Sequence, residues 1–459
     1  MKRPASGPAA TAPWLSGSTL AIALGRSGEE DRALLRQAIA VVLVRALGLA
    51  LAFATSIVLA RMLGAEGFGI YSFAVAVLVI LRIVSLFGLD GVLVREVAAN
   101  RELDKPARLK GVVVFGAAAI LLLSLAVTSV TLVGVRTAGP PDWPYAGTLM
   151  IALLALAPMA LLGGAAAILE AFRFPLPGQV AESILRPCLF LILIGMIVLP
   201  LGRHLTPEIA AGIHALSYLG ALLVAVGYLL ARIHADVWTA SATFTARVWL
   251  GAAAGFALTN AAYIITENTD VVMLAAFADP DAVGIYRAAA RYAQLVSFAL
   301  LAAMLPLRPR ISAAFARDDR MAQRRAARTA AVLAMAIGLP AAVLLIAFGD
   351  VLLAVFGDEF IGGRVALTIL VVGQVVNVAA GHVGVLMTMT GHEKRVAATV
   401  GAAALCNIVL NFLLIPRFGI AGAAAATAIS LVLWNGAMLF WVIKHLRINP
   451  TIFGRAAGE

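Results

Sequence analysis

Residues 38–60 read AIAVVLVRALGLALAFATSIVLA, and residues 68–90 read FGIYSFAVAVLVILRIVSLFGLD. Each run contains about 20 mostly apolar residues, the length that an α-helix needs to cross the roughly 30 Å hydrocarbon core of a bilayer. Backbone groups in lipid have no water to bond, so a spanning segment must satisfy them within its own helix. The two runs therefore predict two transmembrane helices joined by a short turn.

The rest of the chain has the same character. Of its 459 residues, 62% are AVILMFWYC and 13% are charged, whereas soluble domains are about 25% charged. A soluble fold of this length cannot hide so much apolar surface, which excludes a soluble enzyme, a nucleic-acid-binding domain, a disordered chain and a disulfide scaffold. We expect an all-α polytopic membrane protein of about 12 transmembrane helices. The other spans are predicted at 111–133, 146–169, 178–200, 210–231, 248–268, 283–306, 329–348, 365–389, 396–415 and 420–443.

Lysine and arginine are concentrated in alternate loops. They gather after the second and eighth predicted helices, at 95–110 and 308–328, and at both ends of the chain, while the opposite loops carry acids such as Asp279 and Glu359. Cytoplasmic loops are the ones enriched in Lys and Arg, and this bias accounts for the net charge of +11 without a nucleic-acid partner. The pattern predicts a multi-pass membrane protein with both termini cytoplasmic.

A short motif occurs twice in the chain. IVLARMLGAEGFGIY ends at Tyr71 and VMLAAFADPDAVGIY ends at Tyr286, and in each an acid precedes Gly-Ile-Tyr. Both copies lie at the corner between the first and second helices of a half, and halves with an even number of helices are parallel repeats of a kind known in transporters. We therefore expect two pseudo-repeated six-helix lobes. The predicted boundaries are a disordered cytoplasmic tail at 1–36, an N-lobe at 37–231, a cytoplasmic linker at 232–247, a C-lobe at 248–445 and a cytoplasmic tail at 446–459.

Five arginines fall within the predicted spans: Arg45, Arg82, Arg186, Arg287 and Arg291. An ionisable residue within the membrane costs about 2.5–3.5 kcal/mol on insertion scales and marks a candidate functional site. Arg287 and Arg291 share one helix face, where like charges repel unless an anion or carboxylate lies between them. Because a guanidinium fork matches phosphate, the set predicts a cationic cavity for an anionic substrate. The alternatives are a structural ion pair between Arg186 and Glu182, four residues earlier, and, for Arg45 and Arg82, snorkelling toward the membrane surface or pairing within the helix bundle.

Other polar side chains in the spans are candidates for further contacts. Asn260, Asn377, Asn407 and Asn411 could contact sugar hydroxyls, although such residues more often join helices to one another. Glu182, Glu267 and Asp270 are candidates for proton or cation coupling. The sequence contains no metal-binding, nucleotide-binding or hydrolase motif, so we expect no catalytic residue, no cofactor and no metal.

Three patches of the chain resemble one family. Leu59–Tyr71, followed by Gly88-Leu89-Asp90-Gly91 and Val94-Arg95-Glu96, is similar to the opening of the polysaccharide flippases, the Wzx-type members of the multidrug/oligosaccharidyl-lipid/polysaccharide (MOP) exporter superfamily. Residues 270–286 resemble their seventh-to-eighth helix corner, and residues 415–423 resemble the entry to their last helices. The resemblance extends over roughly 35–445.

That resemblance implies a two-lobed transporter that works by alternating access. It would move a polyprenyl-pyrophosphate-linked oligosaccharide across the inner membrane for cell-surface polysaccharide or O-antigen synthesis. A cationic central cavity is also implied, and Arg45, Arg186, Arg287 and Arg291 are its candidates by position and chemistry. The expected partners are the lipid-linked oligosaccharide, membrane lipids and the polysaccharide polymerase or export machinery.

Two other functions remain open from the sequence. A cation-coupled multidrug exporter of the same superfamily would favour acids over arginines in its cavity. A membrane-embedded glycan polymerase or ligase would need a large loop outside the membrane to hold its substrate, and no predicted loop is long enough. The sequence therefore favours a transporter over an enzyme.

Overall fold

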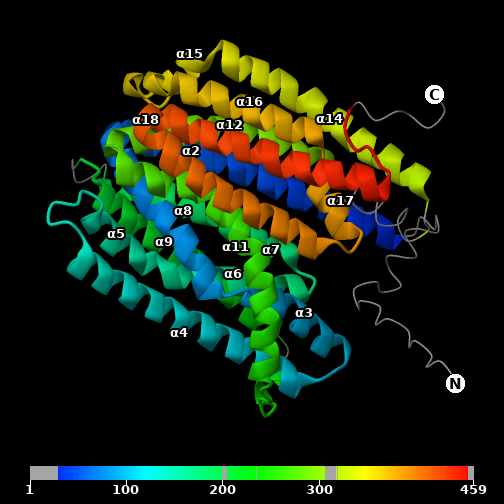
Figure 1. Ribbon diagram of the computed structural model, residues 1–459. Helices are drawn as coiled ribbons and strands as arrows, with labels where there is room; N and C mark the ends of the chain where they lie inside the picture. Colours follow the sequence, from blue (N-terminus) through cyan, green and yellow to red (C-terminus); the bar gives the residue numbers. More distant parts are fainter. Residues whose placement is uncertain (1–28, 199–203, 234, 305–316, 318, 453–459) are drawn as a thin grey trace, which may run out of the picture.

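The computed structural model describes residues 29–198, 204–233, 235–304, 317 and 319–452 (Figure 1). Within these ranges the chain forms α-helices with short 3₁₀ and π turns, and it contains no strand. The long helices lie side by side in one bundle, with α4 at one edge and α14, α15 and α16 at the opposite edge (Figure 1). This agrees with the predicted all-α membrane fold.

The helices follow one another along the chain with short connections. The N-terminal half contains α2 (Glu29–Leu86), α3 (Leu89–Glu102), α4 (Pro106–Ala138), α5 (Ala146–Ala152), η1 (Leu153–Ala155), α6 (Leu156–Ala171), α7 (Pro175–Val180), η2 (Ala181–Leu185), α8 (Arg186–Val198) and α9 (Pro207–Arg232). The short α10 (Ala235–Thr239) precedes the C-terminal half. That half contains α11 (Ala246–Phe277), α12 (Pro280–Met304), α14 (Arg320–Ala347), α15 (Gly349–Ala354), η3 (Asp358–Gly363), α16 (Arg364–Ala380), α17 (Val383–Met389), α18 (Glu393–Trp441) and η4 (Val442–Leu446).

Eight helical stretches in the described chain are long and apolar enough to cross a membrane. Two of them are interrupted by a glycine, Gly64 in α2 (φ 70°, ψ 178°) and Gly419 in α18 (φ 54°, ψ −131°). Residues with side chains rarely adopt positive φ, so each glycine allows the chain to turn and begin a second helix. With α2 and α18 counted as two helices each, and with α11 and α12 added, the described ranges contain twelve long helices, which match the predicted spans.

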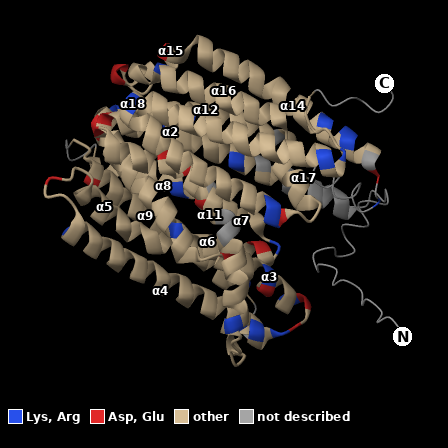
Figure 2. Ribbon diagram, viewed as in Figure 1, with Lys and Arg blue, Asp and Glu red and all other residues tan. Residues whose placement is uncertain are grey.

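Charged side chains separate toward the two ends of the bundle (Figure 2). One end, which we call the basic end, carries Arg101, Arg108, Lys110, Arg324 and Arg325, where α3 ends and where α4 and α14 begin. The other, which we call the acidic end, carries Asp279, Asp281, Asp350, Asp358 and Glu359. The described parts of the Lys- and Arg-rich loops thus lie at one end of the molecule.

The two lobes meet near the acidic end through the repeated corner. Gly69 of α2 and Gly284 of α12, the two glycines of the Gly-Ile-Tyr repeat, pack directly against the facing backbone. A Cβ on Gly69 would lie 1.7 Å from the Pro280 carbonyl oxygen, and one on Gly284 would lie 2.1 Å from the Ala65 carbonyl oxygen. Small residues at such a crossing allow two helices to approach closely. The sequence repeat therefore marks the contact between the lobes.

Hydrogen bonds between the lobes flank this crossing. Arg61 donates from Nε to the Val355 carbonyl oxygen at 2.8 Å and from Nη2 to the Ala354 carbonyl oxygen at 2.9 Å. The backbone amide of Ala65 donates to Oε1 of Glu359 at 2.6 Å. The glycine crossing and these three hydrogen bonds together form what we call the interlobe clasp.

The start of the chain and the linker differ from the predicted boundaries. Helix α2 begins at Glu29, inside the segment predicted as a disordered tail, and residues 1–28 lie outside the described residues. The linker packs on the N-lobe: Nζ of Lys110 donates to the carbonyl oxygens of Trp238 at 2.6 Å and Ala240 at 3.0 Å. A Cβ on Gly111 would lie 2.0 Å from the Thr243 carbonyl oxygen, so this contact is close.

Two parts of the predicted C-lobe and C-terminal tail also pack differently. Trp249 and Ala253 of α11 are buried in the same core as Leu89 and Leu93 of α3, so the first half of α11 packs with the N-lobe. At the other end, Ile448 is buried in the C-lobe core, in the segment predicted as a cytoplasmic tail. Burial of these apolar side chains decides which lobe each segment packs against. The position at which an apolar run ends in the sequence does not.

Candidate functional site

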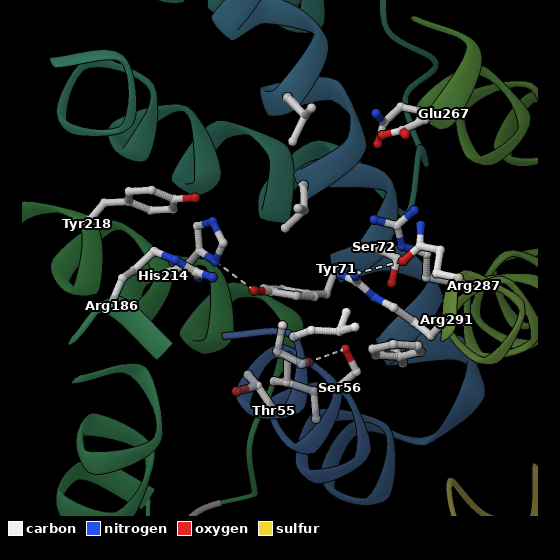
Figure 3. A pocket seen from close by; sticks show the side chains of 18 of the residues that line it. Thr55, Ser56, Tyr71, Ser72, Arg186, His214, Tyr218, Glu267, Arg287 and Arg291 are labelled. Carbon is white, nitrogen blue, oxygen red and sulfur yellow. Dashed lines mark hydrogen bonds between the residues drawn. The ribbon is translucent and has the colours of Figure 1, made fainter. Parts of the chain in front are cut away.

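A pocket of about 530 Å³ lies between the two lobes (Figure 3). Its lining comes from both limbs of α2 and from α8 and α9 in the N-lobe, and from α11 and α12 in the C-lobe. On α2 and α12 the lining residues run from Phe68 to Val79 and from Arg287 to Phe298. They therefore extend from the interlobe clasp away from the acidic end.

The C-lobe side of the pocket is cationic. Arg287 and Arg291 lie one turn apart on α12, half-buried, on the same side of the pocket as Glu267 of α11 (Figure 3). Nη1 of Arg291 donates to Oε1 of Gln294 at 3.4 Å. Its buried Nε has no hydrogen-bond partner among the described residues. A buried donor left unsatisfied costs about 1–3 kcal/mol, and a ligand oxygen in the pocket would satisfy this one.

The N-lobe side combines aromatic rings with one arginine. The Tyr71 hydroxyl and Nδ1 of His214 form a hydrogen bond of 2.7 Å, and the ring centroids of His214 and Tyr218 lie 5.0 Å apart. Arg186, the first residue of α8, has its guanidinium carbon 5.0 Å from the Tyr218 ring centroid, within cation–π range. Nε of Arg186 also donates to the Glu182 carbonyl oxygen at 3.4 Å. These contacts hold Arg186 at the pocket wall.

Among the described residues, no carboxylate pairs with the three arginines that line the pocket. The ion pairs between described residues, with nitrogen and oxygen within 4.0 Å, include none formed by Arg186, Arg287 or Arg291. Like charges repel more strongly where protein and lipid lower the effective dielectric. Cations from both lobes facing one pocket therefore create a site that favours an anion.

Arg82, also predicted for the cavity, does not line it. Its Nη1 forms a salt bridge with Oε1 of Glu182 at 3.1 Å, and a Cβ on Gly163 would lie only 2.5 Å from its Nη2. The alternative pairing of Glu182 with Arg186 is therefore wrong. Glu182 belongs to the π turn η2 (Ala181–Leu185), which ends directly before Arg186, and the wider turn changes the face on which a residue four positions away lies.

Arg45 does not line the pocket either. Its side chain is exposed, and its Nε donates to Oε1 of Gln179 at 3.3 Å. Arg45 lies on α2 about one turn before Leu49, the first α2 residue of the pocket lining. It therefore contacts α7, the helix that carries Gln179, rather than the cavity.

Asp270 lies at the centre of a second, buried polar cluster in the C-lobe. Its carboxylate accepts hydrogen bonds from the Tyr286 hydroxyl at 2.6 Å, from Nδ2 of Asn411 at 2.7 Å and from the Thr427 hydroxyl. Nδ2 of Asn411 also donates to Oδ1 of Asn407 at 3.0 Å. Both asparagines are fully buried outside the pocket. The predicted sugar contacts of Asn407 and Asn411 are therefore contradicted, because these amides join α18 to α11.

Asn377, another predicted sugar contact, does not line the pocket. Nδ2 of Asn377 donates to Oε1 of Gln374 at 3.1 Å, and its Oδ1 accepts from Nδ2 of Asn435 at 3.0 Å. Asn377 thus joins α16 to α18, whereas the side chain of Asn260 lies outside the described residues. Among the described residues, no group of three or more His, Cys, Asp or Glu side chains could hold a metal ion.

The predicted site did not include three pocket residues, Tyr71, His214 and Tyr218. Tyr71 carries a sequence signal, since it ends the repeated motif, and His214 is an ionisable residue within an apolar span. Tyr218 follows His214 by four positions and so shares its helix face. Only the packing of α9 against α2 shows that these side chains meet.

Comparisons with known proteins agree with this fold. The family model for "Polysaccharide biosynthesis protein" matches residues 34–315, and the MatE model matches residues 256–413. A search of curated protein sequences finds no match.

Several solved structures share the fold at low sequence identity. They include the inward-facing conformation of a multidrug resistance MATE family transporter of the MOP superfamily (TM-score 0.75, 15% identity, 89% of this chain and 98% of that chain). Lipid II flippase MurJ in an inward closed conformation is also similar (TM-score 0.69, 17% identity, 88% and 86%). A third is a MOP superfamily transporter from Pyrococcus furiosus, described as having a binding pocket of reverse polarity (TM-score 0.64, 14% identity, 92% and 96%). Because the first family model covers more than half of the sequence, the chain belongs to the polysaccharide biosynthesis protein family of the MOP superfamily.

Proposed function

We propose that the protein is a flippase that moves polyprenyl-pyrophosphate-linked oligosaccharide units across the inner membrane and holds each unit by its diphosphate. One observation carries this proposal. Arg186 of the N-lobe and Arg287 and Arg291 of the C-lobe line the same pocket, and none forms an ion pair with a described carboxylate. Guanidinium groups bind phosphate oxygens through paired, charge-assisted hydrogen bonds.

The size of the pocket supports a headgroup as the ligand. Its volume of about 530 Å³ falls in the range of about 300–1,000 Å³ that is usual for ligands of drug size. The diphosphate and the nearest sugars occupy the pocket, while the polyprenyl tail stays in lipid, where its apolar surface is already free of water. The family description, polysaccharide biosynthesis, and the similar structure named as a lipid II flippase support a lipid-linked saccharide. A polysaccharide polymerase or export machinery would receive the product.

Alternating access fits the asymmetry of the contacts between the lobes. The interlobe clasp joins them toward the acidic end, and the pocket leads away from the clasp. By the loop-charge rule the basic end faces the cytoplasm, which supports an inward-facing state and cytoplasmic termini. Opening the clasp and closing the basic end would expose the same arginines to the other side of the membrane.

Of the three acids predicted for coupling, we favour Asp270. Its carboxylate joins α11, α12 and α18 through Tyr286, Asn411 and Thr427, so a proton or cation bound there would change how these helices pack. Tyr286 follows Gly284 of the clasp by two residues, which connects the cluster to the contact between the lobes. Glu182 is engaged by Arg82, and Glu267 faces the pocket.

A cation-coupled multidrug exporter is the second candidate. Glu267 lies in the same pocket and is a carboxylate that an organic cation would bind, and a similar structure is a multidrug resistance transporter. A glycan polymerase or ligase has less support, because the similar structures are transporters.

Transport in proteoliposomes tests the proposal. The substrate is lipid-linked oligosaccharide extracted from the host membrane, and its appearance in the outer leaflet is measured. Replacing Arg186, Arg287 or Arg291 by alanine should lower the rate about tenfold or more, because a charge-assisted hydrogen bond contributes about 1.5–3 kcal/mol. Arg45→Ala, an arginine outside the pocket, is the matched control and should stay within about twofold.

Two results would contradict the proposal. One is full transport by all three pocket variants, which would show that a flippase does not hold its substrate through these arginines. The other is transport of an organic cation by the unmodified protein in the absence of lipid-linked oligosaccharide transport, which would support the drug exporter.

A further inference from the structure

We propose that the pocket contains two chemically different subsites, one on the C-lobe side for the diphosphate and one on the N-lobe side for the first sugar. The sugar subsite consists of Tyr71, His214 and Tyr218. This inference rests on the proposed function and adds the part of the substrate that each wall recognises. Figure 3 shows the division, with Tyr218 and His214 on one side, Arg287 and Arg291 on the other, and Tyr71 between them.

His214 supplies the observation that points to a ligand. Its side chain is only 5% exposed and lines the pocket. Nδ1 is occupied by the Tyr71 hydroxyl at 2.7 Å, whereas the buried Nε2 has no hydrogen-bond partner among the described residues. A buried polar atom in the wall of a pocket that lacks a partner is a position where a ligand group is expected.

The chemistry of His214 favours a hydroxyl group as that partner. If the Tyr71 hydroxyl donates to Nδ1, Nε2 carries the proton and is a donor. If Nδ1 donates to Tyr71, Nε2 is an acceptor. A sugar hydroxyl can both donate and accept, so it satisfies Nε2 in either tautomer. A phosphate oxygen can only accept a hydrogen bond, so it satisfies Nε2 only in the tautomer in which Nε2 is the donor.

Aromatic rings complete the sugar subsite. The ring centroid of His214 lies 5.0 Å from that of Tyr218 and 5.8 Å from that of Tyr71. Such rings offer an apolar face with polar atoms at the edge, which suits a sugar ring with C–H groups on its faces and hydroxyls around its rim. Tyr71 and Tyr218 are both buried, at 7% and 6% exposure, and are therefore fixed in position.

The opposite wall suits the diphosphate. Arg287 and Arg291 lie there without carboxylate partners among the described residues, and the buried Nε of Arg291 is unsatisfied in the same part of the structure. Arg186, stacked against Tyr218 at 5.0 Å, lies beside the sugar subsite. In a lipid-linked sugar the diphosphate is bonded directly to the first sugar, so neighbouring subsites of these two kinds match the order of groups in the substrate.

Binding of two kinds of probe to the full-length protein in nanodiscs tests this division. The first probe is undecaprenyl diphosphate, and the second is the same lipid carrying glucose, galactose or N-acetylglucosamine. We expect the unmodified protein to bind at least one sugar-bearing probe about tenfold more tightly than the bare diphosphate, since one well-formed hydrogen bond contributes about 1 kcal/mol and stacking adds to it.

Variants at His214 and Arg291 distinguish the sugar subsite from the diphosphate subsite. His214→Asn keeps an amide near the position of Nδ1 for Tyr71 but removes Nε2, so the preference for sugar should fall to about threefold or less while affinity for the bare diphosphate stays within about twofold. His214→Gln reaches toward the position of Nε2 and should restore part of the preference. Arg291→Ala should weaken all probes about tenfold or more, because both kinds carry the diphosphate. Unchanged binding of the bare diphosphate also shows that the His214 variants are folded.

Two outcomes overturn the sugar subsite. One is an unmodified protein that binds every sugar-bearing probe no more tightly than the bare diphosphate. The other is a His214→Asn protein that keeps the full preference or loses affinity for both kinds of probe equally. Failure of the unmodified protein to bind any diphosphate probe would instead refute the proposed function, and the subsite with it.

Discussion

Replacing Gly69 by alanine should shift the protein away from the clasped state. A Cβ at this position would lie 1.7 Å from the Pro280 carbonyl oxygen, 2.8 Å from the Pro280 carbonyl carbon and 2.9 Å from the Gly284 amide nitrogen. Side-chain carbons essentially never approach closer than 3.0 Å. The two backbones would therefore have to separate by about 1.3 Å at this crossing, because neither partner is a flexible side chain.

Overpacking of this kind costs about 1–3 kcal/mol. The strain exists only while the lobes are clasped, so it is a difference in free energy between the two states. A difference of that size changes the ratio of the clasped to the unclasped state by about 5-fold to 150-fold. Gly284→Ala, whose Cβ would lie 2.1 Å from the Ala65 carbonyl oxygen, should act in the same direction.

Distance measurements between spin labels across the acidic end provide the assay. Cysteines replace Thr137 at the end of α4 and Val351 in α15, both exposed, in a chain whose own Cys188 and Cys406 have been substituted. The longer-distance population should grow in Gly69→Ala. Gly195→Ala is the matched control, because its Cβ would meet no atom within 4 Å. Identical distance distributions in the folded Gly69 variant and the control would refute the reasoning.

Three further predictions concern other parts of the molecule. Arg82→Leu should lower the free energy of unfolding by about 1–3 kcal/mol because it leaves Glu182 unpaired in the membrane. The double variant Arg82→Leu/Glu182→Leu should regain most of that stability. Equal thermal unfolding of the single and double variants would contradict this prediction. In proteoliposomes, Asp270→Asn should abolish the response of transport to an imposed proton or sodium gradient, whereas Glu267→Gln should retain that response. A response that persists without the Asp270 carboxylate would exclude Asp270 as the coupling site. Lys110→Met removes hydrogen bonds to the Trp238 and Ala240 carbonyl oxygens, so it should speed chymotryptic cleavage within 238–245 several-fold. Lys105→Met is the control. Equal cleavage of both variants would mean that these hydrogen bonds do not hold the linker.

The arginines show how far sequence reasoning about the site extends. Their place within apolar spans identified Arg186, Arg287 and Arg291 as candidates, and all three line the pocket. The same reasoning also selected Arg82, and it offered Glu182 as a partner for Arg186, because residues four apart share a face of a regular α-helix. The π turn at Ala181–Leu185 departs from that geometry, and Glu182 pairs with Arg82 instead. Spacing in the sequence does not reveal such a local change in helical periodicity.

The asparagines illustrate the same limit over a longer distance. Asn411 and Asp270 are separated by 141 positions and nevertheless share a hydrogen bond of 2.7 Å. From the sequence, Asn407 and Asn411 share one helix face and are candidates for contact with sugar hydroxyls. Their true partner depends on how α18 is rotated about its axis and on which helix packs beside it. Neither quantity follows from the identity of neighbouring residues.

Local properties of the chain were sufficient for the membrane fold. Hydropathy summed over about 20 residues determines which segments enter lipid, loop charge predicts which loops share a side of the membrane, and the repeated motif predicts two six-helix lobes. Only the tertiary structure decided which polar groups are paired, that Tyr71, His214 and Tyr218 meet, and that one pocket draws arginines from both lobes. The physical reason is that insertion into lipid depends on each segment alone, whereas partner choice depends on the crossing and rotation of helices that are distant in the sequence.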